Sequence, residues 1–210
     1  MPDEPPIPES LRSVLERSRS LGFLGPGDIE QHVRNARCFD PLIPLNADVL
    51  DLGSGGGVPG LVLAEERDDL RIVLLDAMSK RIAFLRDAVR VGAWNERVST
   101  RLGRAEELAH DPTLRASFDV VVVRSFAPPA VTAECGVGFL RPGGVLLVSE
   151  PTDRRDRWPT EGLSQLGLAA EAGINYKHTR IQALRRVAPL PDSYPRGVGV
   201  PARHPLFESH

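Results

Sequence analysis

A run of glycines preceded by a carboxylate is the part of this 210-residue chain best suited to chemistry. The run reads Asp51-Leu-Gly-Ser-Gly-Gly-Gly-Val-Pro-Gly60 and follows an apolar segment at residues 49–52. Glycine has no Cβ, so such a loop can turn tightly and let a ligand approach the backbone. The helix that we expect next presents the partial positive charge of its N-terminus to the same ligand. The pattern therefore favours a cofactor-binding loop over a tight turn that binds nothing.

A dinucleotide is one cofactor that this loop could bind. The spacing Gly55-x-Gly57-x-x-Gly60 matches the dinucleotide fingerprint. In that interpretation Asp76, at the end of the second apolar segment, would bind the adenosine ribose. A nicotinamide-dependent oxidoreductase is therefore one hypothesis, although the sequence shows no proton donor for it.

S-adenosylmethionine (SAM) fits a longer version of the same loop pattern. The pattern Asp51-x-Gly53-x-Gly55-x-Gly57 places a carboxylate two residues before the first glycine. Methyltransferases of the Rossmann-like class have an acidic residue there, close to the methionine end of SAM. Asp51 would repel a pyrophosphate but attract the sulfonium and amino groups of SAM. We therefore favour SAM as the cofactor, with contacts from all four of these residues.

Two later segments also fit a SAM site. A carboxylate such as Asp76 can accept hydrogen bonds from both ribose hydroxyls, although it could instead cap the following turn. The segment at residues 103–107 comes after the third predicted strand, where such folds hold the adenine, and within it we expect Glu107 to be solvated. Residues 140–144, Leu-Arg-Pro-Gly-Gly, resemble the turn before the fifth strand of these methyltransferases.

Short apolar segments alternate with helical ones and predict the scaffold for this site. The expected strands are residues 49–52, 72–75, 98–102, 118–123 and 145–149, and the expected helices are 58–66, 79–91 and 130–139, with a short turn at 105–109. Residues 119–123 are apolar on both faces, as in a central parallel strand. The order predicts an α/β fold with a doubly wound, mostly parallel sheet, as in Rossmann-like class I SAM-dependent methyltransferases. We expect a last helix near 161–172 and a last strand near 181–187.

The pattern also suggests how the chain divides. Residues 1–45 are predicted to form a leader with a short helical extension, in which we expect helices near 11–22 and 28–39. Residues 46–210 are predicted to form the SAM-dependent methyltransferase domain. The segment after Pro189 is rich in proline and glycine, and we expect it to be an irregular surface segment.

Composition narrows the function classes. The chain has 26 Lys and Arg against 28 Asp and Glu, a formal net charge of −2, which argues against nucleic-acid binding by bulk charge. The two cysteines lie far apart and lack metal-ligand spacing, so we expect no disulfide and no metal. The first residues are acidic and proline-rich, unlike a signal peptide, and no apolar run approaches the roughly 20 residues that span a bilayer. We expect a soluble cytoplasmic protein without membrane contact.

Four segments together resemble one family. They are residues 57–60, Gly-Val-Pro-Gly; residues 75–86, Leu-Asp-Ala-Met-Ser-Lys-Arg-Ile-Ala-Phe-Leu-Arg; residues 124–127, Arg-Ser-Phe-Ala; and the proline-punctuated tail at 194–206. In this order they resemble the bacterial small-subunit ribosomal RNA guanine-N(7) methyltransferases, also called glucose-inhibited division protein B. The resemblance extends over roughly residues 28–207.

The resemblance implies a function and assigns residues to it. It implies cofactor contacts at Gly53, Val58, Ala105, Glu106 and Arg124. Arg124 is the residue we expect nearest the chemistry, as the catalytic residue that orients the cofactor or the incoming base, although a structural ion pair is the alternative. The implied reaction is methylation of a guanine at N(7), with ribosomal RNA or the small ribosomal subunit as partner.

The chain also departs from the family pattern. Ser149-Glu150-Pro151 stands where the family commonly has Leu-Lys-Gly, which reverses a charge on the expected substrate side. Residues 1–27 lack the family's N-terminal signature, and His32 is a remnant of the segment that comes after that signature. Methylation of another RNA or a small molecule, and SAM binding without catalysis, are therefore alternatives. The C-terminal third, residues 151–210, has 9 basic against 6 acidic side chains, and we expect RNA to bind there. The arginines in question are Arg154, Arg155, Arg157, Arg185, Arg186, Arg196 and Arg203.

Overall fold

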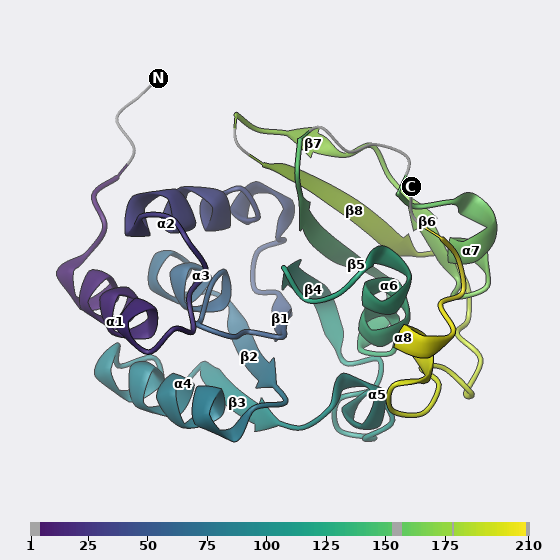
Figure 1. The fold of residues 1–210 in the computed structure, drawn as a ribbon, viewed down its shortest axis with the longest axis horizontal. Coiled ribbons are helices and arrows are strands. Elements are labelled where there is room, and N and C mark those ends of the chain that lie inside the picture. The colour runs from purple at the N-terminus through teal and green to yellow at the C-terminus, as the bar shows by residue number, and fades with distance from the viewer. Residues whose placement is uncertain (1–4, 153–156, 178, 209–210) are drawn as a thin grey trace.

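The chain forms one mixed sheet with helices on both faces (Figure 1). The computed structural model describes residues 5–152, 157–177 and 179–208. The helices are α1 (Glu9–Ser20), α2 (Ile29–Arg37), η1 (Asp40–Leu42), α3 (Gly60–Glu66), α4 (Ser79–Val91), α5 (Ala105–Leu108), α6 (Pro129–Val137), α7 (Thr160–Ser164) and α8 (Val200–Arg203). The strands are β1 (Asp48–Leu52), β2 (Arg71–Asp76), β3 (Val98–Leu102), β4 (Phe118–Arg124), β5 (Leu140–Glu150), β6 (Leu168–Ala170), β7 (Ile174–Asn175) and β8 (Arg180–Arg186).

The sheet confirms the predicted strands and their parallel arrangement. The strand order is β3-β2-β1-β4-β5-β8-β6, and the five strands from β3 to β5 are parallel. The last predicted strand is β8, and it runs antiparallel to β5. β1 and β4 are adjacent at the centre although two strands separate them in sequence. This is the switch point where open α/β sheets bind ligands beyond the carboxyl ends of their strands.

Side chains that alternate along the central strands form a hydrophobic core on each face. Val120 and Val122 of β4 pack with α1 to α4, whereas Val121 and Val123 pack with α5 to α7. In Figure 1 these two groups of helices lie on opposite sides of the sheet. The valines at residues 120–123 are thus covered on both faces, which confirms the doubly wound α/β fold.

The N-terminal helices share the core of the main sheet. Leu11 and Leu15 of α1 and Val33 of α2 are fully buried in one cluster with residues of α3, α4 and the sheet. Asp28 caps α2, since its side chain accepts a hydrogen bond from Gln31 N at 2.6 Å. The predicted division between residues 45 and 46 falls in the turn before β1, but side chains from both sides of it form one core.

The predicted helix over residues 161–172 is wrong. α7 ends at Ser164, and the chain then reverses at Gly167, whose φ is +65°. A Cβ at Gly167 would lie 2.6 Å from the carbonyl oxygen of Ala188, so only glycine fits there. The apolar residues after it form β6, where Leu168 pairs with Arg186 of β8. Residues 168–170 therefore pair with β8 in the sheet, although their sequence pattern favours a helix.

The C-terminal segment is held against α6 by a buried carboxylate. Glu134 of α6 is fully buried and accepts hydrogen bonds from Arg196 Nε at 2.8 Å and Nη2 at 2.7 Å. The backbone N–H of Arg196 donates to the same side chain at 2.8 Å. The segment that we expected to be irregular therefore includes a short helix, α8, beside the functional edge of the sheet.

Candidate functional site

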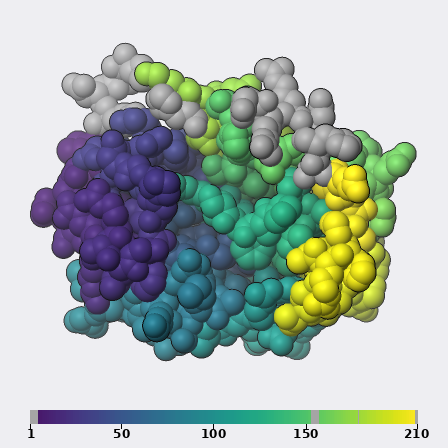
Figure 2. Space-filling model, viewed as in Figure 1, coloured from purple at the N-terminus to yellow at the C-terminus, as the bar shows by residue number. Residues whose placement is uncertain are grey.

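The carboxyl ends of β1, β2 and β4 border two neighbouring cavities. The wider one has a volume of about 340 Å³, and its lining includes Gly53, Asp76, Ala105 and Phe126. The other, of about 220 Å³, lies between residues 23–25 and the glycine loop. In the space-filling view the surface is hollowed between the N-terminal segment, in purple, and the C-terminal segment, in yellow (Figure 2). The two cavities share the lining residues Gly53, Arg81 and Ser125, so a ligand that extends across the switch point could contact both.

The glycine loop has the conformation that its sequence predicted. Gly53, Gly55 and Gly57 have φ values of +73°, +52° and +93°, in the left-handed region that favours glycine. The N–H groups of Gly53 and Ser54 both donate to the carbonyl oxygen of Leu75, at 2.8 and 2.9 Å, and tie the loop to β2. A Cβ at Gly53 would lie 2.5 Å from the ring of Phe126. Gly57 faces Leu61 in the core and lines neither cavity.

Asp51 lies beneath the loop. Its side chain is buried, with 1% of the residue exposed, and it accepts a hydrogen bond from Gly60 N at 2.9 Å at the start of α3. Burial raises the pKa of Asp51 to about 7, although the Gly60 N–H favours the ionised form. Asp51 borders neither cavity directly. Asp51 would therefore act on a ligand in the cavities through its negative charge, and this charge changes with pH in the neutral range.

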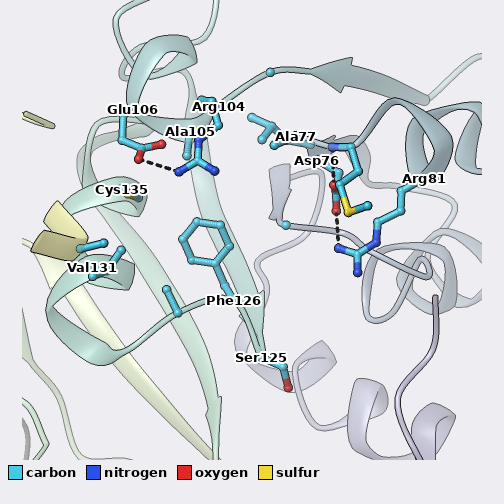
Figure 3. Close-up of a pocket in the computed structure, with 16 residues that line it drawn as sticks. Asp76, Ala77, Arg81, Arg104, Ala105, Glu106, Ser125, Phe126, Val131 and Cys135 are labelled. Atoms are coloured by element: carbon cyan, nitrogen blue, oxygen red, sulfur yellow. Dashed lines mark hydrogen bonds and ion pairs between the residues drawn. The ribbon is translucent and has the colours of Figure 1, made fainter. Parts of the chain in front are cut away.

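Asp76 links the loop to the wider cavity. Its Oδ2 accepts from Gly55 N at 2.9 Å, and its Oδ1 accepts from Met78 N at 2.8 Å. Oδ1 keeps a second lone pair for a ligand hydroxyl, and Oδ2 can accept from a second hydroxyl in place of its long hydrogen bond from Arg81 Nη1. Arg81 Nη1 lies 3.5 Å from Asp76 Oδ2, and Arg81 Nε is buried with no hydrogen-bond partner among the described residues. Figure 3 shows both side chains along one wall of the cavity.

The opposite wall comes from the start of α5. Ala105 and Glu106 line the wider cavity, and the ring of Phe126 projects between this wall and the one formed by Asp76 (Figure 3). Glu106 accepts from Arg104 Nη2 at 2.9 Å and from the backbone N–H of Gly199 at 3.1 Å. Burial acts to raise the pKa of Glu106, but these hydrogen bonds outweigh it and hold the pKa below its ordinary value. Glu107 is exposed, as expected.

Arg124 is held in place by a histidine of the N-terminal helices. Its Nη2 lies 2.5 Å from Nδ1 of His32 in α2. The other ring nitrogen of His32, Nε2, lies 3.0 Å from the carbonyl oxygen of Gly25 and must donate to it. Nδ1 is then the acceptor for Arg124 in the neutral ring. Burial, together with the charge of Arg124, lowers the pKa of His32 and so favours this neutral form.

Of the nine site residues predicted from the sequence, the structure brings seven to the two cavities. They are Gly53, Gly55, Val58, Asp76, Ala105, Glu106 and Arg124. The sequence did not assign a site role to His32, Ser125 or Phe126. Ser125 has a φ of +53°, unusual for a residue with a side chain, and no local pattern signals it. The segment 23–25 was also missed, because its distance from the loop in sequence hides their contact.

Sequence comparison identifies the family. The family model described as rRNA small subunit methyltransferase G matches residues 28–161. The chain is 34% identical over 194 residues to the ribosomal RNA small subunit methyltransferase G of Parasynechococcus marenigrum strain WH8102, covering 80% of this chain and 75% of the relative. The chain belongs to this family.

Solved structures show the same fold at low sequence identity. The O-methyltransferase from Bacillus cereus in complex with SAH has a TM-score of 0.63 and 18% identity, covering 86% of this chain and 92% of that one. An RNA methyltransferase from Salinibacter ruber in complex with S-adenosyl-L-homocysteine has a TM-score of 0.56 and 15% identity, with 80% and 97% covered. The chain therefore has the Rossmann-like fold of class I SAM-dependent methyltransferases.

The residue that departs most from the family pattern proves to be internal. Glu150, at the end of β5, has a fully buried side chain whose Oε1 accepts from Arg157 Nη1 at 2.8 Å and from Trp158 Nε1 at 3.0 Å. Its negative charge is therefore balanced by Arg157 and is not presented to a substrate.

The arginines expected to contact RNA are partly engaged within the protein. Arg157, Arg185 and Arg196 form ion pairs with Glu150, Glu171 and Glu134. Arg186 donates to a backbone carbonyl, and Arg154 and Arg155 lie outside the described residues. Arg203 is exposed at the end of α8.

The described part of the chain contains no group of three or more His, Cys, Asp or Glu side chains placed to hold a metal ion. Both cysteines are buried and form no disulfide, and burial raises the pKa of the Cys135 thiol. Within the same described residues, no helix combines the length and apolar character needed to cross a membrane.

Proposed function

We propose that this protein transfers a methyl group from SAM to N(7) of a guanine in the RNA of the small ribosomal subunit. The observation that carries the proposal is the switch-point site, where the glycine loop, Asp76 and Arg124 border two neighbouring cavities. Membership of the rRNA small subunit methyltransferase G family supports the reaction and the RNA partner. The same membership disfavours the nicotinamide-dependent alternative.

The residues at the site fit SAM. Asp76 can accept from one ribose hydroxyl at Oδ1 and from the other at Oδ2 if that hydroxyl replaces the long hydrogen bond from Arg81 Nη1. The buried, unpartnered Nε of Arg81 can donate to an acceptor of the cofactor. Ala105 and Glu106 form the wall for the adenine. Gly53 and Gly55 leave room for the methionine portion to lie against the backbone, next to Arg124. Asp51 supplies negative charge beneath that end.

The reaction requires no proton transfer by the protein at the acceptor atom. SAM supplies a methyl group on a positively charged sulfur. The lone pair of guanine N(7) forms the new N–C bond, the electron pair of the broken C–S bond stays on sulfur, and the positive charge passes to the purine. N(7) carries no proton, so no general base is required. The protein must orient the two reactants in line and exclude water, and the hydrogen bond between Arg124 and His32 serves that orientation.

Transfer of labelled methyl groups tests this proposal. Purified protein is incubated with methyl-labelled SAM and small ribosomal subunits that lack N(7) methylation, and the RNA is digested and analysed for N(7)-methylguanosine. Label in that nucleoside is expected, together with a rise in melting temperature with SAM or its demethylated product and none with NAD. Absence of SAM binding, or SAM binding with no label in the RNA, would contradict the proposal.

A further inference from the structure

A third cavity adjoins the candidate cofactor site. It has a volume of about 180 Å³ and lies between the carboxyl ends of β4 and β5. Its lining shares Ser125, Phe126 and Ala127 with the wider cavity, so the loop after β4 separates the two. The remaining wall includes Thr132, Ser149, Pro151, Arg157 and Trp158. Ser125 lines all three cavities, so a group bound here would lie beside a cofactor that spans the other two.

A buried carboxylate fixes the outer wall of this cavity. Glu150 Oε1 accepts hydrogen bonds from both the Arg157 guanidinium and the Trp158 indole N–H. Its other oxygen, Oε2, is buried without a partner among the described residues. A buried charge costs stability unless it is paired, so Glu150 holds Arg157 firmly. The Arg157 side chain is only 17% exposed, and its other nitrogens have no hydrogen-bond partner among the residues that the structure describes.

This combination suits one nucleobase in particular. Phe126 and Trp158 offer aromatic surface to a flat ring, and proteins commonly stack unpaired RNA bases on such side chains. Guanine carries two acceptors, O6 and N7, on one edge, whereas adenine has an amino donor in place of O6. A fixed arginine donor therefore favours guanine. A hydrogen bond to O6 leaves the N7 lone pair free to react.

We propose that the cavity between β4 and β5 receives the acceptor guanine of the RNA, and that Arg157, held by Glu150, recognises its O6 atom. The inference rests on the proposed methyl transfer and adds to it the acceptor site and the residue that selects guanine. It also gives Glu150 a role, since the carboxylate at this family-divergent position holds the arginine that lines the cavity.

Binding of a free nucleotide tests the cavity without requiring catalysis. Trp158 is the reporter, because the other tryptophan, Trp94, is buried in the core on the opposite face of the sheet. The indole N–H signal of Trp158, assigned with Trp158→Phe, is followed by NMR while 5′-GMP or 5′-AMP is added to protein saturated with the demethylated cofactor. A saturable shift with GMP, a much smaller one with AMP and none in Arg157→Gln are expected. Equal shifts with GMP and AMP would overturn the proposal.

Kinetic measurements distinguish recognition of guanine by Arg157 from a purely structural role of that residue. Arg157→Gln leaves Glu150 without its cation and so can destabilise the fold, whereas the double variant Glu150→Gln/Arg157→Gln removes both charges. Both variants are expected to bind SAM like the wild type and to lose about tenfold or more in kcat/KM on small-subunit RNA. Arg157→Lys, which keeps one donor, should fall between them and the wild type. Recovery of full activity in the double variant would overturn the proposal.

The outcomes distinguish this inference from the proposed function. If the wild type transfers no methyl group to RNA, the proposed function fails, while the GMP titration still decides whether the cavity binds guanine. If the wild type methylates RNA and the Arg157 variants match it, the function stands and the acceptor site is wrong.

Discussion

At the scale of single residues, Asp51 makes the site sensitive to neutral pH. Its pKa is raised to about 7 by burial, so folding favours the protonated form. Without cofactor, the contribution of Asp51 to stability is therefore full below its unfolded pKa and is lost as pH rises through about 7. A nearby sulfonium favours the carboxylate, so binding of SAM should release a proton. We expect SAM affinity to rise with pH up to about 7, by as much as about tenfold per pH unit.

Calorimetric titration at several pH values measures this pH dependence of SAM affinity, with the demethylated product as the matched ligand. The product lacks the sulfonium charge, so the ratio of the two affinities should rise across the same range. Asp51→Asn keeps an acceptor for Gly60 N–H but has no charge. In this variant the ratio of SAM affinity to product affinity should stay constant with pH. A constant ratio in the wild type would show that the Asp51 charge does not act on the sulfonium.

His32 is the second residue whose removal is informative. His32→Ala takes away the acceptor that holds Arg124, and hydrogen bonds to charged groups contribute about 1.5–3 kcal/mol. We expect SAM affinity to fall about tenfold or more, and His32→Asn, which can offer an oxygen in place of Nδ1, to fall less. His110→Ala is the control, because His110 bonds the carbonyl oxygen of Pro195 outside the set of cavity residues. Unchanged SAM affinity in His32→Ala would contradict the positioning role.

At the scale of elements, the N-terminal helices complete the cofactor site. Ser18 of α1 donates to the carbonyl oxygen of Gly56 at 2.9 Å, and a Cβ at Gly56 would lie 2.8 Å from the carbonyl oxygen of Phe23. Gly56→Ala should therefore push this segment away from the loop. We expect a loss of about 1–3 kcal/mol in the free energy of unfolding and weaker SAM binding.

Chemical denaturation and calorimetry measure the two effects of Gly56→Ala. Gly197→Ala is the matched control, since a Cβ there has no atom within 4 Å. The control should bind SAM like the wild type. Gly56→Ala with wild-type stability and affinity would mean that the N-terminal segment is not coupled to the loop.

The elements show which features could be predicted from sequence and which could not. The parallel strands and the glycine loop follow from local patterns, because apolar strands and left-handed glycines are dictated by nearby residues. The helix expected over residues 161–172 was wrong because β6 gains its hydrogen bonds from β8, which is distant in sequence. His32 and the cavity at Arg157 depend on tertiary contacts that no spacing reveals.

At the scale of the whole molecule, the C-terminal third supplies less free positive charge than its composition suggested. Three of its arginines are bound to carboxylates, whereas Arg203 is exposed next to Ala202, which lines the wider cavity. We expect RNA affinity to fall with salt, and Arg203→Gln to reduce the slope of log K against log salt by about 1. Arg185→Gln, which removes a paired arginine, is the control and should leave the slope nearly unchanged. Equal slopes in all three proteins would place RNA elsewhere.

The most direct measurement is a map of N(7)-methylguanosine in the small-subunit RNA of cells with and without the gene. One mark is expected to disappear on deletion and to return when subunits from the deletion strain are incubated with the purified protein and SAM. A map that is the same in both strains, with no mark added by the purified protein, would contradict the proposed function.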